Sequence, residues 1–122
     1  NDFQLKVRKI KEDLTNLLSQ LKREGKIVAA LGASAKGNTL LNYCNIGPDL
    51  VKYIFDATQE KQNKLTPGKH IPIISQDRLM EKKPDYLLLL AWNFADEIIR
   101  RTKNYKESGG KYIIPLPELK II

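Results

Sequence analysis

Apolar residues recur at alternating spacings of four and three along the beginning of the chain, and charged side chains fill much of the space between them. The apolar positions are Phe3, Val7, Ile10, Leu14, Leu17 and Leu21. This pattern predicts one amphipathic helix that ends before Gly25, a residue suited to a C-terminal cap. The pattern covers fewer than three heptads, so it does not establish a coiled coil. We expect the apolar stripe to pack on the rest of this domain or on a neighbouring one.

After Gly25, short apolar runs alternate with stretches typical of helices. The runs predicted as strands are residues 27–31, 51–55, 72–74, 86–91, 112–114 and 119–122. The predicted helices are residues 39–44 with Asn38 as cap, residues 75–82 with Ser75 as cap, and a helix that follows residues 92–94 and continues to about residue 105. Residues 57–71 have no clear periodicity, and a connection this long inside a compact domain is usually functional or mobile.

Strands that alternate with helices imply right-handed crossovers and a parallel sheet covered on both faces. The predicted fold class is therefore α/β, a Rossmann-like three-layer sandwich with a mostly parallel sheet of five to six strands. We divide the chain into an N-terminal amphipathic helix at residues 1–24 and a Rossmann-like domain at residues 25–122. Ligands of such folds bind beyond the carboxyl ends of the strands.

The composition indicates one ordered domain. The chain has 122 residues, of which 42% are hydrophobic and 29% charged, and both fractions are ordinary for a globular protein. No apolar run reaches the roughly 18 residues of a membrane-spanning helix, so we expect no membrane contact. A chain that begins at Asn1 is interpreted as a piece of a longer protein. The single cysteine, Cys44, cannot form an internal disulfide, which favours a reducing, cytoplasmic location. With one cysteine and one histidine, a zinc site is unexpected.

The net charge of +7 favours anionic partners such as phosphates, nucleic acid or a membrane surface. The basic residues are spread along the chain, however, and aromatic residues are not interleaved with them as in nucleic-acid-binding proteins. We therefore expect no nucleic-acid partner, and many of these charges are interpreted as solvated faces.

The loop after the first predicted strand has a composition suited to phosphate binding. Gly32 and Gly37 bracket small residues, Ser34 could donate a hydrogen bond and Lys36 could supply a positive charge at the start of a helix. The loop matches neither of the common glycine-rich nucleotide motifs, so a plain tight turn is the alternative. Asp56 follows Gly32 by 24 residues, near the position of the ribose-binding acid in dinucleotide domains, although an acid at a strand end is also a common turn former.

Two further groups are candidate ligand contacts. Lys69 and His70 lie in the long connection, where His70 could act as an acid or base but is more often a surface residue. Trp92, Asn93 and Phe94 end the central strand, where the aromatic pair could stack a base and Asn93 could read its edge. The alternative is core packing of Phe94 with Ile98 and Ile99, and a helix cap by Asn93. No nucleophile–base pair or metal cluster is visible, so we expect a binding domain without catalytic residues of its own.

Four segments together strongly resemble one family. GASAKGNTLLNYC at residues 32–44, KLTPGKHIPI at 64–73, LLLLAWNFADEII at 87–99 and GGKYIIPLP at 109–117 resemble the C-terminal domain of the S-adenosylmethionine-dependent sugar C-methyltransferases. The resemblance covers about residues 27–117. It implies a parent enzyme with a zinc-binding domain, a methyl-donor domain that supplies the catalytic base, and a Rossmann-like C-terminal domain that helps to hold a nucleotide-linked keto-deoxysugar of the dTDP type.

The resemblance also implies how the candidate residues are used. The loop at residues 32–37 would face the diphosphate or the joined active site, and residues 64–70 and 92–94 would line the nucleotide-sugar pocket. The partners would be the other domains of the parent chain, and S-adenosylmethionine would bind there and not to this fragment. Two alternatives remain open: a stand-alone nucleotide- or dinucleotide-binding module, and an assembly domain whose helical stripe forms a homodimer that Leu14→Glu would dissociate.

Overall fold

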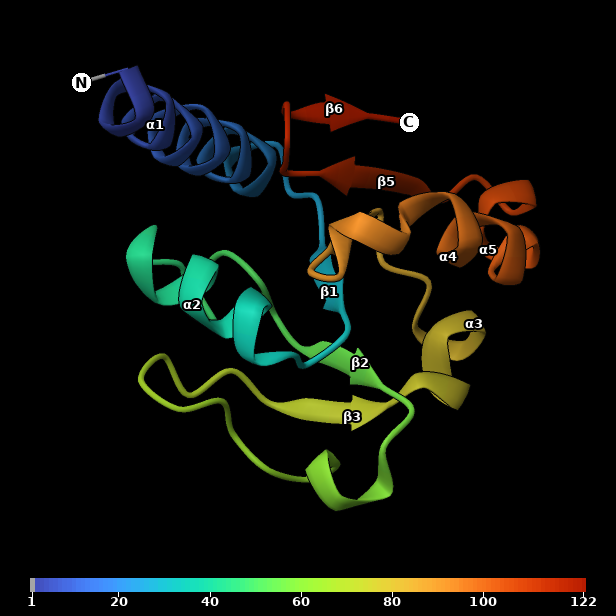
Figure 1. Cartoon of the computed structure of the whole chain (residues 1–122). Helices are drawn as coiled ribbons and strands as arrows, with labels where there is room; N and C mark the ends of the chain where they lie inside the picture. Colours follow the sequence, from blue (N-terminus) through green and yellow to red (C-terminus); the bar gives the residue numbers. More distant parts are fainter. Residues whose placement is uncertain (1) are drawn as a thin grey trace.

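The computed structural model describes residues 2–122, with the side chain of Phe3 excepted, so the expected place of Phe3 in the apolar stripe lies outside the described residues. Six strands form one sheet in the order β3-β2-β1-β4-β5-β6 (Figure 1). The strands are β1 (Val28–Leu31), β2 (Ile54–Asp56), β3 (Ile73–Ser75), β4 (Tyr86–Leu89), β5 (Lys111–Ile114) and β6 (Lys120–Ile121). All pairs are parallel except β5 with β6. The predicted α/β class with a mostly parallel sheet is confirmed.

Helices cover both faces of this sheet. The helices are α1 (Asp2–Arg23), α2 (Ala35–Tyr43), α3 (Leu79–Lys82), α4 (Ala95–Arg101) and α5 (Lys103–Glu107), with short 3-10 turns η1 (Gln59–Lys61), η2 (Gln76–Arg78) and η3 (Trp92–Phe94). Figure 1 shows α1 and α2 on one side and α3, α4 and α5 on the other. Because side chains alternate across a strand, Leu88 packs in the core with α1 and α2, and Leu87 and Leu89 in the core with α4 and α5.

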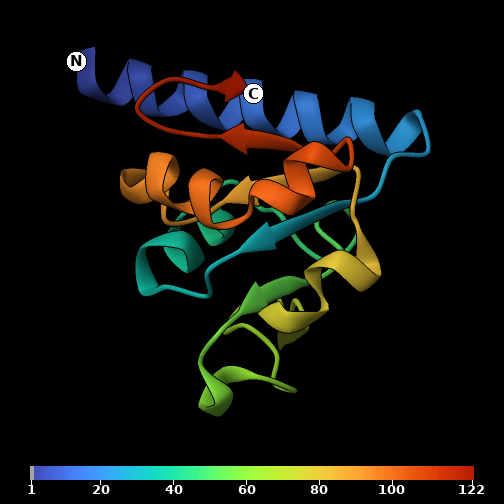
Figure 2. The same cartoon turned by 90° about the vertical axis from the view of Figure 1, so that its right-hand side faces the viewer.

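The C-terminal half of α1 is part of the domain core. Leu14, Leu18 and Leu21 are buried in the same cluster as the sheet residues, whereas Leu17 is only half-buried. The predicted stripe missed Leu18 because a straight helix of 3.6 residues per turn drifts from a strict heptad spacing. Figure 2 shows α1 running across the width of the molecule, beside β5, β6 and their connection.

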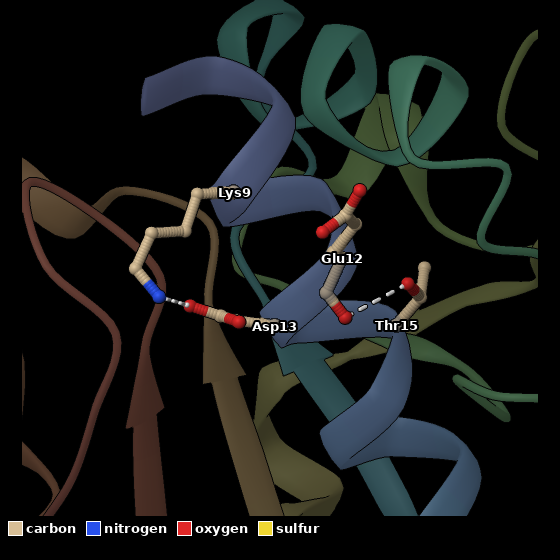
Figure 3. Close-up of polar contacts among 4 residues, drawn as sticks. All are labelled: Lys9, Glu12, Asp13 and Thr15. Carbon is tan, nitrogen blue, oxygen red and sulfur yellow. Dashed lines mark hydrogen bonds and ion pairs between the residues drawn. The ribbon is translucent and has the colours of Figure 1, made fainter. Parts of the chain in front are cut away.

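The outer face of α1 is polar. Lys9 and Asp13 form an exposed ion pair with an Nζ–Oδ2 distance of 2.9 Å, and Thr15 Oγ1 donates to the backbone oxygen of Glu12 at 3.3 Å (Figure 3). The hydrogen bond with Asp13 raises the pKa of Lys9. Exposed pairs of this kind contribute little to stability, so the apolar face of α1 is what holds it in place.

Three local predictions are corrected. The helix α2 begins at Ala35 rather than at residue 39, and its cap is Ser34, not Asn38. The sequence interpretation placed Gly37 in the loop, whereas Gly37 lies in the first turn of the helix and its N–H donates to the capping Ser34 Oγ. Phe94 is 61% exposed rather than buried, because η3 intervenes and Ala95 takes the inward position. Asn93 does not cap α4, whose first turn has no side-chain cap. Ser75 does cap the next turn, accepting from the N–H of Asp77.

The crossover from β2 to β3 contains no α-helix. Residues 57–72 hold only η1 and an isolated bridge between Leu65 and Pro72. Two backbone hydrogen bonds, Asn63 N–H to Ile73 O and Ile73 N–H to Lys64 O, hold this segment beside the outer edge of β3. The absence of periodicity in the sequence therefore corresponds to an irregular crossover, which we call the crossover segment (residues 57–72).

Candidate functional site

The strand order creates a topological switch point between β1 and β4, where the chain leaves neighbouring strands toward opposite faces. Open α/β sheets bind ligands at such a point, outside the carboxyl ends of the strands. The loop after β1 leads directly into α2 (Figure 1), and the chain after β4 leads into η3. Lys36 Nζ lies 5.3 Å from the centre of the Trp92 ring, within the range of a cation–π contact. The structure thus brings together two of the predicted groups, which we call the switch-point rim: residues 32–36 and 92–94.

The N-terminus of α2 presents free hydrogen-bond donors at this rim. Ser34 Oγ accepts from the N–H of Gly37 at 3.0 Å, and the backbone oxygen of Ser34 accepts from the N–H of Asn38. The N–H groups of Ala35 and Lys36 precede the first intrahelical bond, and residues 2–122 provide no acceptor for them. Free N–H groups and the positive end of the helix dipole make such a terminus attractive to anions.

The two glycines of the loop serve different purposes. Gly32 has φ +94°, so it supplies the left-handed turn out of β1. The space around it does not require a glycine, because a Cβ there would meet Ala91 only at 3.8 Å. Gly37 is buried inside α2, and a Cβ there would lie 2.6 Å from the Cβ of Leu90. Gly37 therefore allows close packing of α2 on the chain after β4, and its backbone N–H is already used by Ser34.

Asp56 holds the loop from the neighbouring strand. Its Oδ2 accepts from the N–H of Ala33 and its Oδ1 from the N–H of Thr58, both at 2.7 Å, and its side chain is only 7% exposed. Burial by itself would raise the pKa of Asp56, but these hydrogen bonds and the nearby Lys61 outweigh burial and lower the pKa. The predicted contact of Asp56 with a ribose remains a prediction. In the structure both carboxylate oxygens accept backbone hydrogen bonds, which fixes the loop.

Lys61 was not among the sequence candidates, yet it contacts the same loop. Its Nζ donates to the backbone oxygen of Ala33 at 2.8 Å. Asp56 and Lys61 therefore bind the N–H and C=O of one residue from two sides. The pairing spans 28 positions, and no local motif in the sequence signals it.

Lys69 and His70 lie away from the switch-point rim. Lys69 Nζ donates to Asn45 Oδ1 just past the end of α2, which is about 13 Å long and begins at the rim. His70 is exposed, with φ 58°, and its N–H donates to the backbone oxygen of Thr66 at 3.0 Å. The structure does not bring these two residues together with Gly32, Ser34 and Lys36.

A cavity of about 700 Å³ lies between α2 and the crossover segment. Its apolar lining includes Leu41, Ile54, Ile73 and Leu90. Its polar lining includes Ser34, Asn38, Thr39, Lys61 and Lys64. Of the segment at residues 64–70 that the resemblance places at the pocket, residues 64–67 line this cavity. The aperiodic stretch in the sequence was the signal for the hollow, because a crossover without a helix leaves part of the sheet uncovered.

Asn93 and Phe94 stand at the exposed side of the rim. Both follow Trp92 in η3, and both side chains are exposed, whereas Trp92 is half-buried against the core. Neither is needed for packing, so both are accessible to a ligand or to another part of a larger protein. Cys44 is buried, as expected of a small hydrophobic residue.

Neither a metal-binding cluster nor a membrane-spanning helix is found among the residues that the structure describes. No three His, Cys, Asp or Glu side chains among residues 2–122 are grouped so as to hold a metal ion. None of the described helices has the length and hydropathy to cross a bilayer.

Comparison with known proteins identifies the family. The sequence model of the C-methyltransferase C-terminal domain matches residues 1–117, which includes α1 as well as the sheet. The chain is also similar to the C-methyltransferase NovU of Streptomyces niveus, with 39% identity over 121 residues that make up 99% of this chain. The chain spans 29% of the length of that relative. This chain belongs to the C-methyltransferase C-terminal domain family.

Proposed function

We propose that this chain is the substrate-holding part of an S-adenosylmethionine-dependent C-methyltransferase that acts on a nucleotide-linked keto-deoxysugar of the dTDP type. Membership of the C-methyltransferase C-terminal domain family supports a role within a methyltransferase. The chain matches less than a third of the length of NovU, which is consistent with a role as one part of a larger enzyme. In that enzyme this part would bind and orient the substrate.

The observation that carries the proposal is the charge and geometry of the switch-point rim. A nucleotide-sugar carries a diphosphate, and the rim offers the free N–H groups of Ala35 and Lys36 with the Lys36 ammonium beside them. Helix N-termini with an adjacent lysine are well suited to phosphate groups. The cation–π contact with Trp92 keeps the Lys36 side chain at the rim.

The methyl donor fits this chain poorly. S-adenosylmethionine is positively charged at its sulfonium, whereas the rim is itself cationic through Lys36 and Lys61. The carboxylate best placed for a ribose, that of Asp56, is engaged by Ala33 and Thr58. The same engagement argues against a dinucleotide-binding module. We therefore assign the methyl donor, and the chemistry that it supplies, to the rest of the parent enzyme.

Calorimetric titration of the chain with thymidine diphosphate tests the proposal. We expect Lys36→Met to weaken binding about fivefold, because it removes one partly exposed charge–phosphate interaction. Lys9→Met is the matched control, since Lys9 is exposed on the outer face of α1, and should leave binding unchanged. Equal losses of affinity in the two variants would show that only the net charge of the chain matters, and would contradict a specific role of Lys36. Absence of any thymidine diphosphate binding would contradict the proposal.

A further inference from the structure

We propose that the cavity between α2 and the crossover segment receives the nucleobase of the nucleotide whose phosphates lie at the N-terminus of α2. This inference rests on the proposed function and goes beyond it by assigning the cavity next to the anion site to a second part of the ligand, the base. The cavity volume, about 700 Å³, falls in the range of about 300–1,000 Å³ typical of small-molecule sites.

The cavity and the anion site share residues. Ser34 and Ala35, the cap and first residue of α2, line the cavity, and so do Lys61 and Lys64 on the opposite wall. A molecule in the cavity therefore lies beside Ala35, the first residue of α2, whose N–H is free and which precedes Lys36. A nucleoside diphosphate, with an uncharged ring system at one end and negative charge at the other, matches this order of surfaces.

The interior of the cavity suits a flat ring better than a carbohydrate. Leu41, Ile54, Ile73 and Leu90 provide apolar surface. The Ser34 hydroxyl already accepts from the N–H of Gly37, and the Thr39 hydroxyl already donates to the backbone oxygen of Ala35, so each has one partner within the chain. A sugar ring would lose hydrogen bonds to water there and find few replacements, whereas the faces of a nucleobase need none.

Asn38 supplies unused hydrogen-bonding capacity. It lines the cavity from α2, and its Oδ1 is shielded from solvent with no hydrogen-bond donor among the described residues. A buried acceptor without a donor is unfavourable. An amide can pair with the edge of a base that presents a donor next to an acceptor. Rotation of the Asn38 side chain toward the cavity would let a ring N–H donate to Oδ1 and satisfy this oxygen.

The opposite wall is fixed before any ligand arrives. The backbone oxygen of Pro67 accepts from Asn42 Nδ2 at 3.3 Å, and Lys61 Nζ donates to the backbone oxygen of Ala33, so the crossover segment is tied both to α2 and to the loop before it. Thr66 is 3% exposed, and its Oγ1 accepts from the N–H of Ile71 at 2.9 Å. A preformed cavity avoids the entropy of ordering a loop on binding.

The test compares thymidine diphosphate with inorganic pyrophosphate in calorimetric titrations of the chain. If the base enters the cavity, we expect thymidine diphosphate to bind about tenfold more tightly than pyrophosphate. Asn38→Leu removes the amide, and Thr39→Trp fills the cavity from an exposed helix position. Each substitution should weaken the binding of thymidine diphosphate about fivefold or more and should change the affinity for pyrophosphate by less than about twofold.

Asn16→Leu, an exposed asparagine in α1, is the matched control and should change neither affinity, and circular dichroism checks that each variant is folded. Equal binding of the two probes to the wild-type chain, or full thymidine diphosphate affinity in both cavity variants, would overturn the nucleobase assignment and leave the anion site intact. Failure of both probes to bind would instead overturn the proposed function, and the nucleobase assignment with it.

Discussion

The Asp56 carboxylate lies at the end of β2 and holds the loop that follows β1, which faces the proposed ligand. Each of its oxygens accepts a backbone hydrogen bond at 2.7 Å, one from Ala33 and one from Thr58. Removing such a partner leaves a partly buried N–H unpaired. Asp56 is thus a positioning residue, because it fixes Ala33 and through it the first turn of α2.

Asp56→Asn should destabilise the chain by about 1–3 kcal/mol near neutral pH, because an amide nitrogen cannot accept one of the two hydrogen bonds. The folded-state pKa of Asp56 lies below the ordinary value of 3.8. Its ionised form therefore stabilises the fold above about pH 4, and that stabilisation is lost as the pH falls through the lower, folded-state value.

Urea unfolding of both proteins from about pH 5 to about pH 2 measures this effect. The difference in free energy of unfolding between wild type and Asp56→Asn should narrow as the pH falls. A difference that stays constant over this range would show that the charge of Asp56 has no part in holding the loop.

The residues of the rim could be predicted only in part. The small residues around Ser34 and Lys36 indicated a phosphate-binding loop because their composition alone carries that signal. The contact of Lys36 with Trp92, the bond from Lys61 to Ala33 and the unpaired Asn38 depend on how distant segments meet. His70 was a candidate only because of its side-chain chemistry. Its neighbour Lys69 bonds to Asn45 past the C-terminal end of α2, which lies far from the rim.

Among the elements, α1 is divided into a half that packs and a half that does not. Leu18 is fully buried against the sheet, whereas Leu5 is 62% exposed. Leu14 is also fully buried in the chain's own core, so Leu14→Glu would disrupt the fold itself and cannot report on a dimer. An assembly role for α1 would have to use its exposed N-terminal half.

Leu18→Ala should therefore lower the free energy of unfolding by about 2–5 kcal/mol, since it leaves a cavity in the core. Leu5→Ala, the matched substitution on the exposed half of the same helix, should stay within about 0.5 kcal/mol of wild type. Urea denaturation monitored by circular dichroism compares the two. Similar effects of both changes would contradict the packing of α1 on this sheet.

The crossover segment depends on Thr66, because a segment with no α-helix and few backbone hydrogen bonds to the sheet needs side chains to satisfy its backbone. Thr66→Val keeps the shape but leaves the N–H of Ile71 without its acceptor, which should cost about 1–3 kcal/mol. Thr15→Val in α1, where the hydroxyl only returns to its own helix (Figure 3), should be nearly neutral. Equal midpoints for the two variants in urea would contradict this account of the segment.

At the scale of the whole molecule, the sequence predicted the architecture because its strands are short, mainly apolar runs separated by amphipathic stretches. That pattern indicates a parallel sheet with two covered faces. It does not specify the strand order, which depends on which crossovers pack together, nor the antiparallel β6 at the edge. The order matters most for function, because it creates the switch point where Lys36 and Trp92 meet.

The position of bound phosphate on the folded chain tests the central claim most directly. In an NMR titration of the ¹⁵N-labelled chain with thymidine diphosphate, the amide signals of Ala35 and Lys36 and the indole N–H signal of Trp92 should shift most, and all three should saturate together. Saturating thymidine diphosphate that leaves these three signals in place, whether or not others move, would contradict the account.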